Sequence, residues 1–172
     1  ENVAVLINGV PVNDMENGRV FWSNWAGLGD VTAATQVQRG LGASKVAVPS
    51  IGGTINILSK NTDIDKGGNI VASIANDGYE KYGFTLSTGL MDNGLAATVN
   101  FSKTTGEGYV DGTQFEGYNY FVNLSKEFND KHKLSFTSFG APQSHGQRQN
   151  ASTIETYRNA ESGIRYNPDW GY

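Results

Sequence analysis

The chain has 172 residues, a formal net charge of -4 and no cysteine. These values exclude a disulfide scaffold, Cys-ligated zinc and thiol catalysis, and they leave no basic stripe that could bind nucleic acid. The mean hydropathy of -0.40 does not exclude a membrane β-barrel, because barrel strands alternate apolar and polar residues.

The first third of the chain predicts short strands separated by glycine-rich turns. The strands are expected at residues 3–8, 35–39 and 53–59. Asn8-Gly9 is a turn signal, and Asp30 is a suitable N-cap for a short helix that begins there. Residues 61–68 are polar and turn-rich, which is typical of a linker.

From residue 69 onward the sequence alternates with a period of two, which predicts longer strands. They are expected at residues 69–76, 82–90, 95–102, 118–126 and 133–139. The turns near residues 92–94 and 129–131 are short, whereas the link 104–116 and the segment from residue 141 onward are longer. Short turns at one end and long loops at the other are typical of outer-membrane barrels.

The alternation alone slightly favours an antiparallel sandwich over a barrel, and only the motifs that precede these strands reverse that order. The two architectures differ in where one apolar stripe lies: it is buried in a sandwich and faces lipid in a barrel. The stripe comprises Phe84, Leu86, Val99, Phe101, Val122 and Leu124.

Three motifs carry a family resemblance. They are Val5-Leu6-Ile7-Asn8-Gly9-Val10-Pro11, Gln36-Val37-Gln38-Arg39-Gly40 and Ile51-Gly52-Gly53-Thr54-Ile55-Asn56-Ile57-Leu58-Ser59-Lys60. In order and spacing they resemble the second half of the plug domain of TonB-dependent outer-membrane receptors. The residues after the plug resemble the first barrel strands of such receptors, particularly those of Bacteroidetes-type bacteria.

The resemblance implies a mixed α+β plug fragment over residues 1–62, followed by antiparallel transmembrane β-barrel strands over residues 63–172. Five strands cannot close a barrel, so the expected barrel is incomplete. Asn8 stands where the family usually has Asp, and Leu41 stands where Pro is common; both changes are tolerable in a turn.

The implied function is TonB-dependent uptake of a scarce nutrient across the outer membrane of a Gram-negative cell. The implied partners are TonB, whose contact region is not among these residues, an extracellular small-molecule or oligomeric nutrient, and outer-membrane lipid. A surface lipoprotein is a conceivable further partner, although no residue indicates one. We expect no enzyme activity, no cofactor and no nucleic-acid partner. Two alternatives stay open: a soluble secreted β-rich module that binds a ligand such as carbohydrate, and a receptor-like subunit of an envelope complex without an import role.

The aromatic and polar segment around residues 15–25 is the candidate ligand site. Rings supply contact area and neighbouring polar groups supply orientation. The candidates are Asn17, Arg19, Phe21, Trp22, Asn24 and Trp25. Of these, Arg19 and Trp25 are expected to be the exposed pair. Phe21 and Trp22 have an alternative role as a cover over the plug core.

Four residues are candidates for docking of the plug on the barrel: Arg39, Gly40, Gly52 and Gly53. The glycines permit close backbone approach. The resemblance implies that Arg39 docks on barrel carboxylates beyond residue 172, and the alternative is an ordinary surface arginine. No metal site is expected: Asn61, Asp63 and Asp65 mimic the start of a calcium loop, but Lys66 occupies the position that requires glycine.

Overall fold

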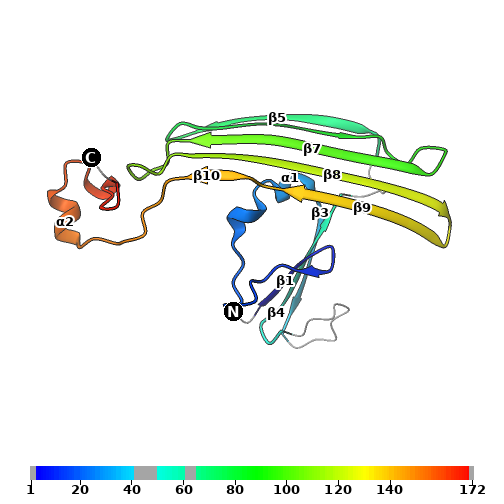
Figure 1. The fold of residues 1–172 in the computed structure, drawn as a ribbon, viewed down its shortest axis with the longest axis horizontal. Coiled ribbons are helices and arrows are strands. Elements are labelled where there is room, and N and C mark those ends of the chain that lie inside the picture. The colour runs from blue at the N-terminus through cyan, green and yellow to red at the C-terminus, as the bar shows by residue number, and fades with distance from the viewer. Residues whose placement is uncertain (1–2, 41–49, 61–64, 171–172) are drawn as a thin grey trace.

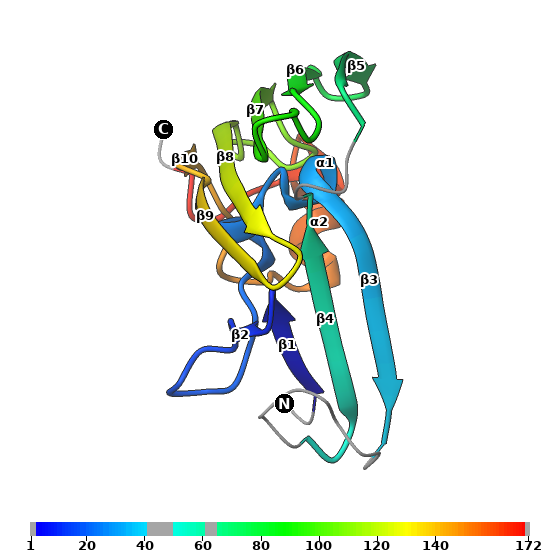
Figure 2. The ribbon, with the colours of Figure 1, turned by 90° about the vertical axis from the view of Figure 1, so that its right-hand side faces the viewer.

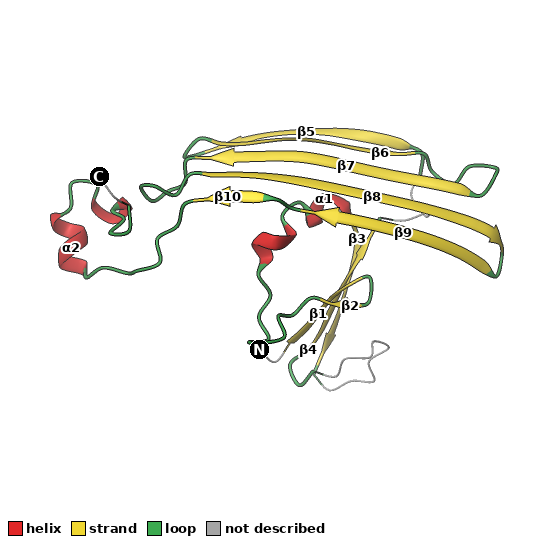
Figure 3. Cartoon of the chain, in the orientation of Figure 1, coloured by secondary structure: helices red, strands yellow, loops and turns green. Residues whose placement is uncertain are grey.

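The computed structural model describes residues 3–40, 50–60 and 65–170. It contains two sheets that cross at a steep angle, with a few short helices around them (Figures 1 and 3). The small sheet has the order β2-β1-β4-β3, and the large sheet has the order β10-β8-β7-β6-β5 with β9 also paired to β8. The sequence boundary expected at residues 62 and 63 lies outside the described residues.

The small sheet comprises β1 Val3–Ile7, β2 Val10–Pro11, β3 Thr32–Arg39 and β4 Gly53–Ser59. The predicted turn at Asn8-Gly9 is confirmed: both residues have positive φ, 51° and 81°, as a two-residue hairpin requires. The Asn8 side chain accepts a hydrogen bond from the backbone N–H of Ser59 at 2.9 Å. Asn at the usual Asp position therefore serves to tie the hairpin to the neighbouring strand.

The helix expected to begin at Asp30 is wrong in position. The helix α1 covers Leu28–Val31, with Gly27 as its N-cap at φ 78°. Residues from Thr32 onward belong to β3 because Thr32 is already in register with Ser59 of β4. Pairing with β4 therefore places the residues from Thr32 onward in a strand, where the sequence predicted a helix.

The large sheet comprises β5 Gly67–Ala75, β6 Tyr79–Ser87, β7 Leu95–Gly106, β8 Phe115–Asn129, β9 His132–Gly140 and β10 Gln143–His145. Each of the five expected strands is present. Because β9 and β10 pair with the same edge of β8 on either side of Pro142, they act as one interrupted strand. Pro lacks the N–H that a ladder needs, and its carbonyl instead accepts from the N–H of Tyr118 at 2.8 Å. The sheet is antiparallel and, in the described residues, open at both edges.

The connections are less unequal than the sequence suggested. Residues 88–94 and 130–131 join strands at one end of the sheet, and residues 76–78 and 107–114 join them at the other (Figure 1). The links 88–94 and 107–114 have nearly the same length. The first residue of link 88–94 still belongs to the hairpin, because the N–H of Thr88 donates to the carbonyl of Ala97 at 2.9 Å. The long segment after β10, residues 146–170, carries α2 Ile154–Asn159 and η2 Gly163–Arg165.

The two faces of the large sheet have the inverse of the polarity found in a soluble sandwich, because apolar side chains are exposed and polar ones are buried. None of the six side chains of the apolar stripe is buried: Leu86 is 54% exposed, Leu124 50%, Phe101 42% and Phe84 40%, while Val99 and Val122 are half-buried. The opposite face is polar, and its middle is buried, whereas Asn69 of β5 and Ser135 and Thr137 of β9 are exposed. Its buried polar members are Thr85, Thr98, Asn100, Ser102, Asn119, Asn123 and Ser125. A sandwich requires the reverse arrangement.

The core lies between the two sheets. Leu28 and Val31 of α1 and Ile57 of β4 pack with Phe121, which projects from the polar face of β8. Figure 2 shows α1 seated beneath the large sheet, while β3 and β4 extend away from it. No helix among the described residues is long and apolar enough to cross a bilayer.

Candidate functional site: the face shared by the two sheets

The predicted ligand residues occupy two local structures. Asn17 and Arg19 are exposed in a turn, where the Asp14 carboxylate accepts from the N–H of Asn17 at 3.0 Å. Asn13 fastens this turn to β1, because its side chain accepts from the N–H of Val5 at 2.7 Å. The turn is thus held by short-range polar contacts that leave both candidate side chains accessible.

The aromatic candidates lie at the short helix η1, Trp22–Trp25, with Phe21 as its N-cap residue. Phe21 and Trp22 are about half exposed, at 48% and 53%, and Asn24 is exposed. Trp25 is half-buried instead of exposed, because its ring stacks on Phe139 of β9 with centroids 5.7 Å apart. The expectation that Trp25 is freely exposed is therefore wrong.

The predicted docking residues lie at the end of the small sheet that points away from the large sheet (Figure 2). Arg39 ends β3, is exposed and is in register with Gly53. Gly53 has φ 114°, and a Cβ there would collide with the carbonyl oxygen of Gln38. Its glycine is therefore required inside the small sheet. Gly40 and Gly52 are exposed, and docking of all four on a barrel wall stays a prediction.

The structure reveals contacts between the two sheets that the sequence reasoning did not identify. Both carboxylate oxygens of Asp30 in α1 accept from Nζ of Lys81 in β6 at 2.8 Å. Beside this pair, Gly27 lies so close to Asn119 that a Cβ would come within 2.6 Å of the Asn119 Cβ. Lys81 lies on the same face of β6 as Thr85. A lysine on this otherwise uncharged polar face could have predicted that an acidic side chain packs against it.

A chain of amides crosses the polar face of the large sheet. The amide of Asn100 donates to the Phe84 carbonyl at 3.0 Å and to Thr85 Oγ1 at 2.9 Å. This fixes the Asn100 oxygen as the acceptor for the Asn119 amide. The Asn119 Oδ1 is then left buried without a hydrogen-bond partner among the described residues. A buried unpaired acceptor is costly.

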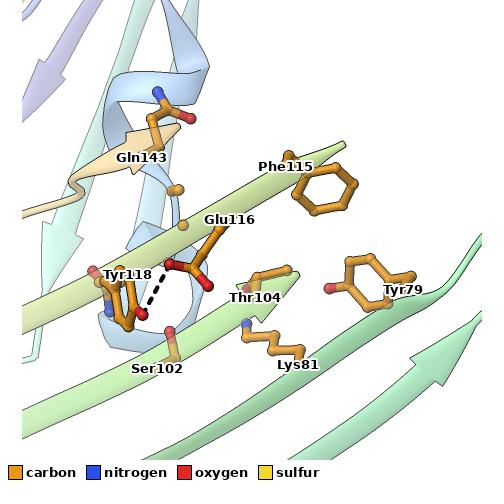
Figure 4. Close-up of a pocket in the computed structure, with 12 residues that line it drawn as sticks. Tyr79, Lys81, Ser102, Thr104, Phe115, Glu116, Tyr118 and Gln143 are labelled. Carbon is orange, nitrogen blue, oxygen red and sulfur yellow. Dashed lines mark hydrogen bonds between the residues drawn. The ribbon is translucent and has the colours of Figure 1, made fainter. Parts of the chain in front are cut away.

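A pocket of about 270 Å³ opens next to Asn119, between the Ala26-Gly27 segment and the large sheet (Figure 4). Its lining combines two aromatic residues at one end with hydroxyl, amide and charged residues. The main lining residues are Tyr79, Lys81, Ser102, Thr104, Phe115, Glu116, Tyr118, Asn119 and Gln143. The rings of Tyr79 and Phe115 have centroids 6.4 Å apart. Among the described residues, no group of three His, Asp or Glu side chains could hold a metal ion.

Three solved structures of outer-membrane receptors of Pseudomonas aeruginosa share this fold. The ferripyoverdine receptor bound to ferripyoverdine matches with a TM-score of 0.61 at 15% identity, covering 78% of this chain and 18% of the receptor. The pyoverdine receptor FpvA bound to pyoverdine gives 0.63 at 14%, covering 78% and 20%. The siderophore receptor PirA gives 0.55 at 19%, covering 83% and 27%.

The chain thus spans between about a fifth and a quarter of the length of these receptors. No family model matches the sequence, and no curated protein matches it significantly. The Bacteroidetes type is not confirmed, and the three similar structures are receptors rather than enzymes. The large open sheet fits an incomplete barrel. The chain therefore has the fold of part of a TonB-dependent outer-membrane receptor.

Proposed function

We propose that this chain is part of a receptor in the outer membrane of a Gram-negative cell, which imports a scarce nutrient through a plugged β-barrel. In this proposal the small sheet, with α1, is the second half of the plug, and β5 to β10 form the first barrel strands. The observation that carries the proposal is the inverted polarity of the large sheet. Its apolar face is exposed, and the middle of its polar face is covered by α1 and one end of the small sheet.

This arrangement suits a strand wall between lipid and a polar lumen. Outer-membrane barrels place apolar residues outward and polar residues inward. A soluble sandwich would leave Leu86, Phe101 and Leu124 exposed to water, while it buried a row of amides and hydroxyls. The soluble binding module is therefore not favoured.

The long segment after β10 supports one orientation of the strands. Short turns of outer-membrane barrels lie in the periplasm and long loops lie outside the cell. In this proposal the end with residues 88–94 and 130–131 is periplasmic, and the end with residues 76–78, 107–114 and the long segment 146–170 lies outside. Phe21, which caps η1, and Trp22 and Asn24 of η1 are exposed and are candidates for a first contact with the nutrient.

Import requires the plug to move, and the energy for this movement must come from outside the receptor. The proposed source is TonB in the periplasm, which contacts a region outside these residues. The similar structures include receptors bound to pyoverdine and ferripyoverdine, which supports a small-molecule nutrient as the general ligand class. Arg39 and its glycine neighbours would fasten the far end of the plug to barrel strands outside this chain.

The proposal is tested by fractionation of the source cells and by mass spectrometry of peptides from a sized gel band. We expect these peptides in a large outer-membrane protein whose mobility differs between unheated and boiled samples. Peptides confined to a soluble protein of about the chain's own 18.5 kDa would contradict the proposal.

A further inference from the structure

The long segment after β10, residues 146–170, is closed on itself by two side chains. The Asp169 carboxylate accepts hydrogen bonds from the backbone N–H and the side-chain amide of Asn150, at 3.1 and 2.8 Å. The guanidinium of Arg148 donates to the carbonyl oxygen of Tyr166 at 3.1 Å. Both contacts join the start of the segment to its end, 19 and 18 residues further along the chain. The segment is therefore a folded loop with α2 between its joined ends.

The end of this segment is a tight turn that its sequence encodes. Pro168 presets the backbone φ that the second position of a β-turn requires. The N–H of Trp170 donates to the carbonyl of Asn167 at 3.3 Å, and the side-chain oxygen of Asn167 accepts from the N–H of Asp169 at 3.1 Å. Asn167 is only 3% exposed, so the turn is packed against the rest of the molecule.

The turn is fastened to the loop between β7 and β8. The side-chain amide of Asn167 donates to the carbonyl of Asp111 at 2.7 Å, and the N–H of Asp111 donates to the carbonyl of Arg165 at 2.9 Å. Both backbone groups of Asp111 are thus bonded to the long segment. The ring of Trp170 also lies against Gly112, where a Cβ would overlap it. The segment and the loop cannot separate unless these contacts break together.

The turn between β5 and β6 joins the same network through Arg165. The guanidinium of Arg165 donates to the Asp77 carboxylate at 2.9 Å and lies 4.8 Å from the centroid of the Tyr109 ring. The carbonyl of Asp77 in turn accepts from the N–H of Glu107 at 2.8 Å. Arg165 therefore connects the long segment to both connections at this end of the large sheet.

The long segment lies across this end of the sheet. Figure 1 shows it beyond the ends of β7 and β8, and Figure 2 places α2 on the same side of the sheet as α1. This is the side of the polar face, which the proposed function assigns to the lumen of the barrel. In a closed barrel the segment would therefore overhang the outer entrance to the lumen.

We infer that residues 146–170 form a preassembled strap at the outer entrance, fixed to the connections 76–78 and 107–114 as one body before any ligand binds. The location of the strap rests on the proposed function, and its fixed attachment goes beyond that function. A strap held in this way narrows the entrance permanently and limits the size of a ligand that can reach the plug. It differs from a lid, which would fold over a ligand only after binding.

Hydrogen exchange tests the strap in the complete receptor, purified from outer membranes in detergent without ligand. We expect slow exchange in residues 107–114 and 163–170. Arg165→Gln should accelerate exchange in both segments about tenfold, the effect of losing roughly 1.4 kcal/mol of local stability. Asn167→Ala should also accelerate both, because it removes the bond to the Asp111 carbonyl. Arg158→Gln is the matched control, since Arg158 is exposed on α2.

Two results would overturn the inference. Rapid exchange of residues 163–170 in the ligand-free wild type would show that the strap is not preassembled. Acceleration confined to residues 163–170 in both Arg165→Gln and Asn167→Ala would show that the connections move independently of it. The shift in gel mobility between unheated and boiled samples verifies that each variant has formed its barrel. Rapid exchange in an inserted receptor removes the strap and leaves the proposed function standing, whereas a receptor that is not in the outer membrane removes the proposed function.

Discussion

Asp30 and Lys81 are 51 residues apart in the sequence, and both oxygens of the carboxylate lie 2.8 Å from the ammonium nitrogen. This ion pair joins α1 to β6, and both side chains are largely shielded from solvent, with 24% and 19% of their surface exposed. It is the most direct polar link between the two sheets among the described residues. The position of the small sheet therefore depends on a contact that forms only when the two units meet.

Removing one partner of this pair should loosen the small sheet. Lys81→Met leaves the Asp30 carboxylate half-buried without its cation, and we expect a loss of about 1–2 kcal/mol, between the values for exposed and buried charged contacts. Hydrogen exchange of residues 28–31 in the complete receptor measures it. The exchanged pair Asp30→Lys with Lys81→Asp should recover part of the protection. Equal exchange in wild type and Lys81→Met would contradict the assigned role.

The two glycines that flank Leu28 provide a matched comparison. Gly27→Ala should be strongly unfavourable, because Gly27 has φ 78° and its Cβ would overlap Asn119. The backbone strain alone amounts to about 1–2 kcal/mol. Gly29→Ala should be neutral or slightly stabilising, since no atom lies within 4 Å of a Cβ there. Thermal unfolding of both variants ranks them, and a lower midpoint for Gly29→Ala than for Gly27→Ala would contradict this packing.

A charged side chain introduced on the apolar face of the large sheet should lower the stability of the receptor in the membrane. Leu86→Arg should reduce stability by about 2–4 kcal/mol if Leu86 faces the middle of the bilayer, because the guanidinium must enter hydrocarbon. Leu86→Met keeps the apolar surface and is the control. The amount of heat-modifiable receptor in the outer membrane measures the effect. Wild-type levels of Leu86→Arg would be incompatible with a lipid-facing Leu86.

The long segment after β10 should respond to acid through Asp169. Its carboxylate accepts hydrogen bonds from the side chain of Asn150 at 2.8 Å and from the backbone N–H groups of Asn150 and Gln149. These bonds, the Asn150 side chain first, lower the pKa of Asp169 below its ordinary value of 3.8. The folded pKa lies below the unfolded one, so the stabilisation is fully present above pH 3.8 and is lost as the pH falls through the folded value.

Trp170 reports this change, because its ring lies against Gly112 of the 107–114 loop. Its fluorescence should be constant above about pH 4 and should change at lower pH. In Asp169→Asn the same titration should be flat. A transition of equal size in Asp169→Asn would assign the acid response to another group.

Much of the fold was predictable because it depends on local pattern. The strand expected at residues 53–59 is β4 at the same bounds, since Gly52 and polar residues limit it on both sides. The alternation also identified which side chains of β6, β7 and β8 share a face. It could not decide whether that face meets lipid or a second sheet; that depends on what covers the other face.

The contacts between the two sheets were not predictable in the same way. Trp25 was expected to be exposed, yet it stacks on Phe139, more than 100 residues further along the chain. Asp30 carried a capping signal, but Gly27 takes the cap position and Asp30 pairs with Lys81. Such contacts require the docked arrangement of two units, which no local pattern contains.

The environment of Leu124, which is half exposed on the apolar face, shows most directly whether the large sheet faces lipid. A spin label on Leu124→Cys in the complete receptor, reconstituted in lipid vesicles, can be relaxed by dissolved oxygen or by a water-soluble nickel chelate. Asn150→Cys on the long segment serves as the aqueous control. If the apolar face meets lipid, oxygen should relax the Leu124 label strongly and nickel almost not at all, and the reverse should hold at Asn150. Strong relaxation by nickel at Leu124 would place this face in water and would contradict the assignment of the large sheet to a membrane barrel.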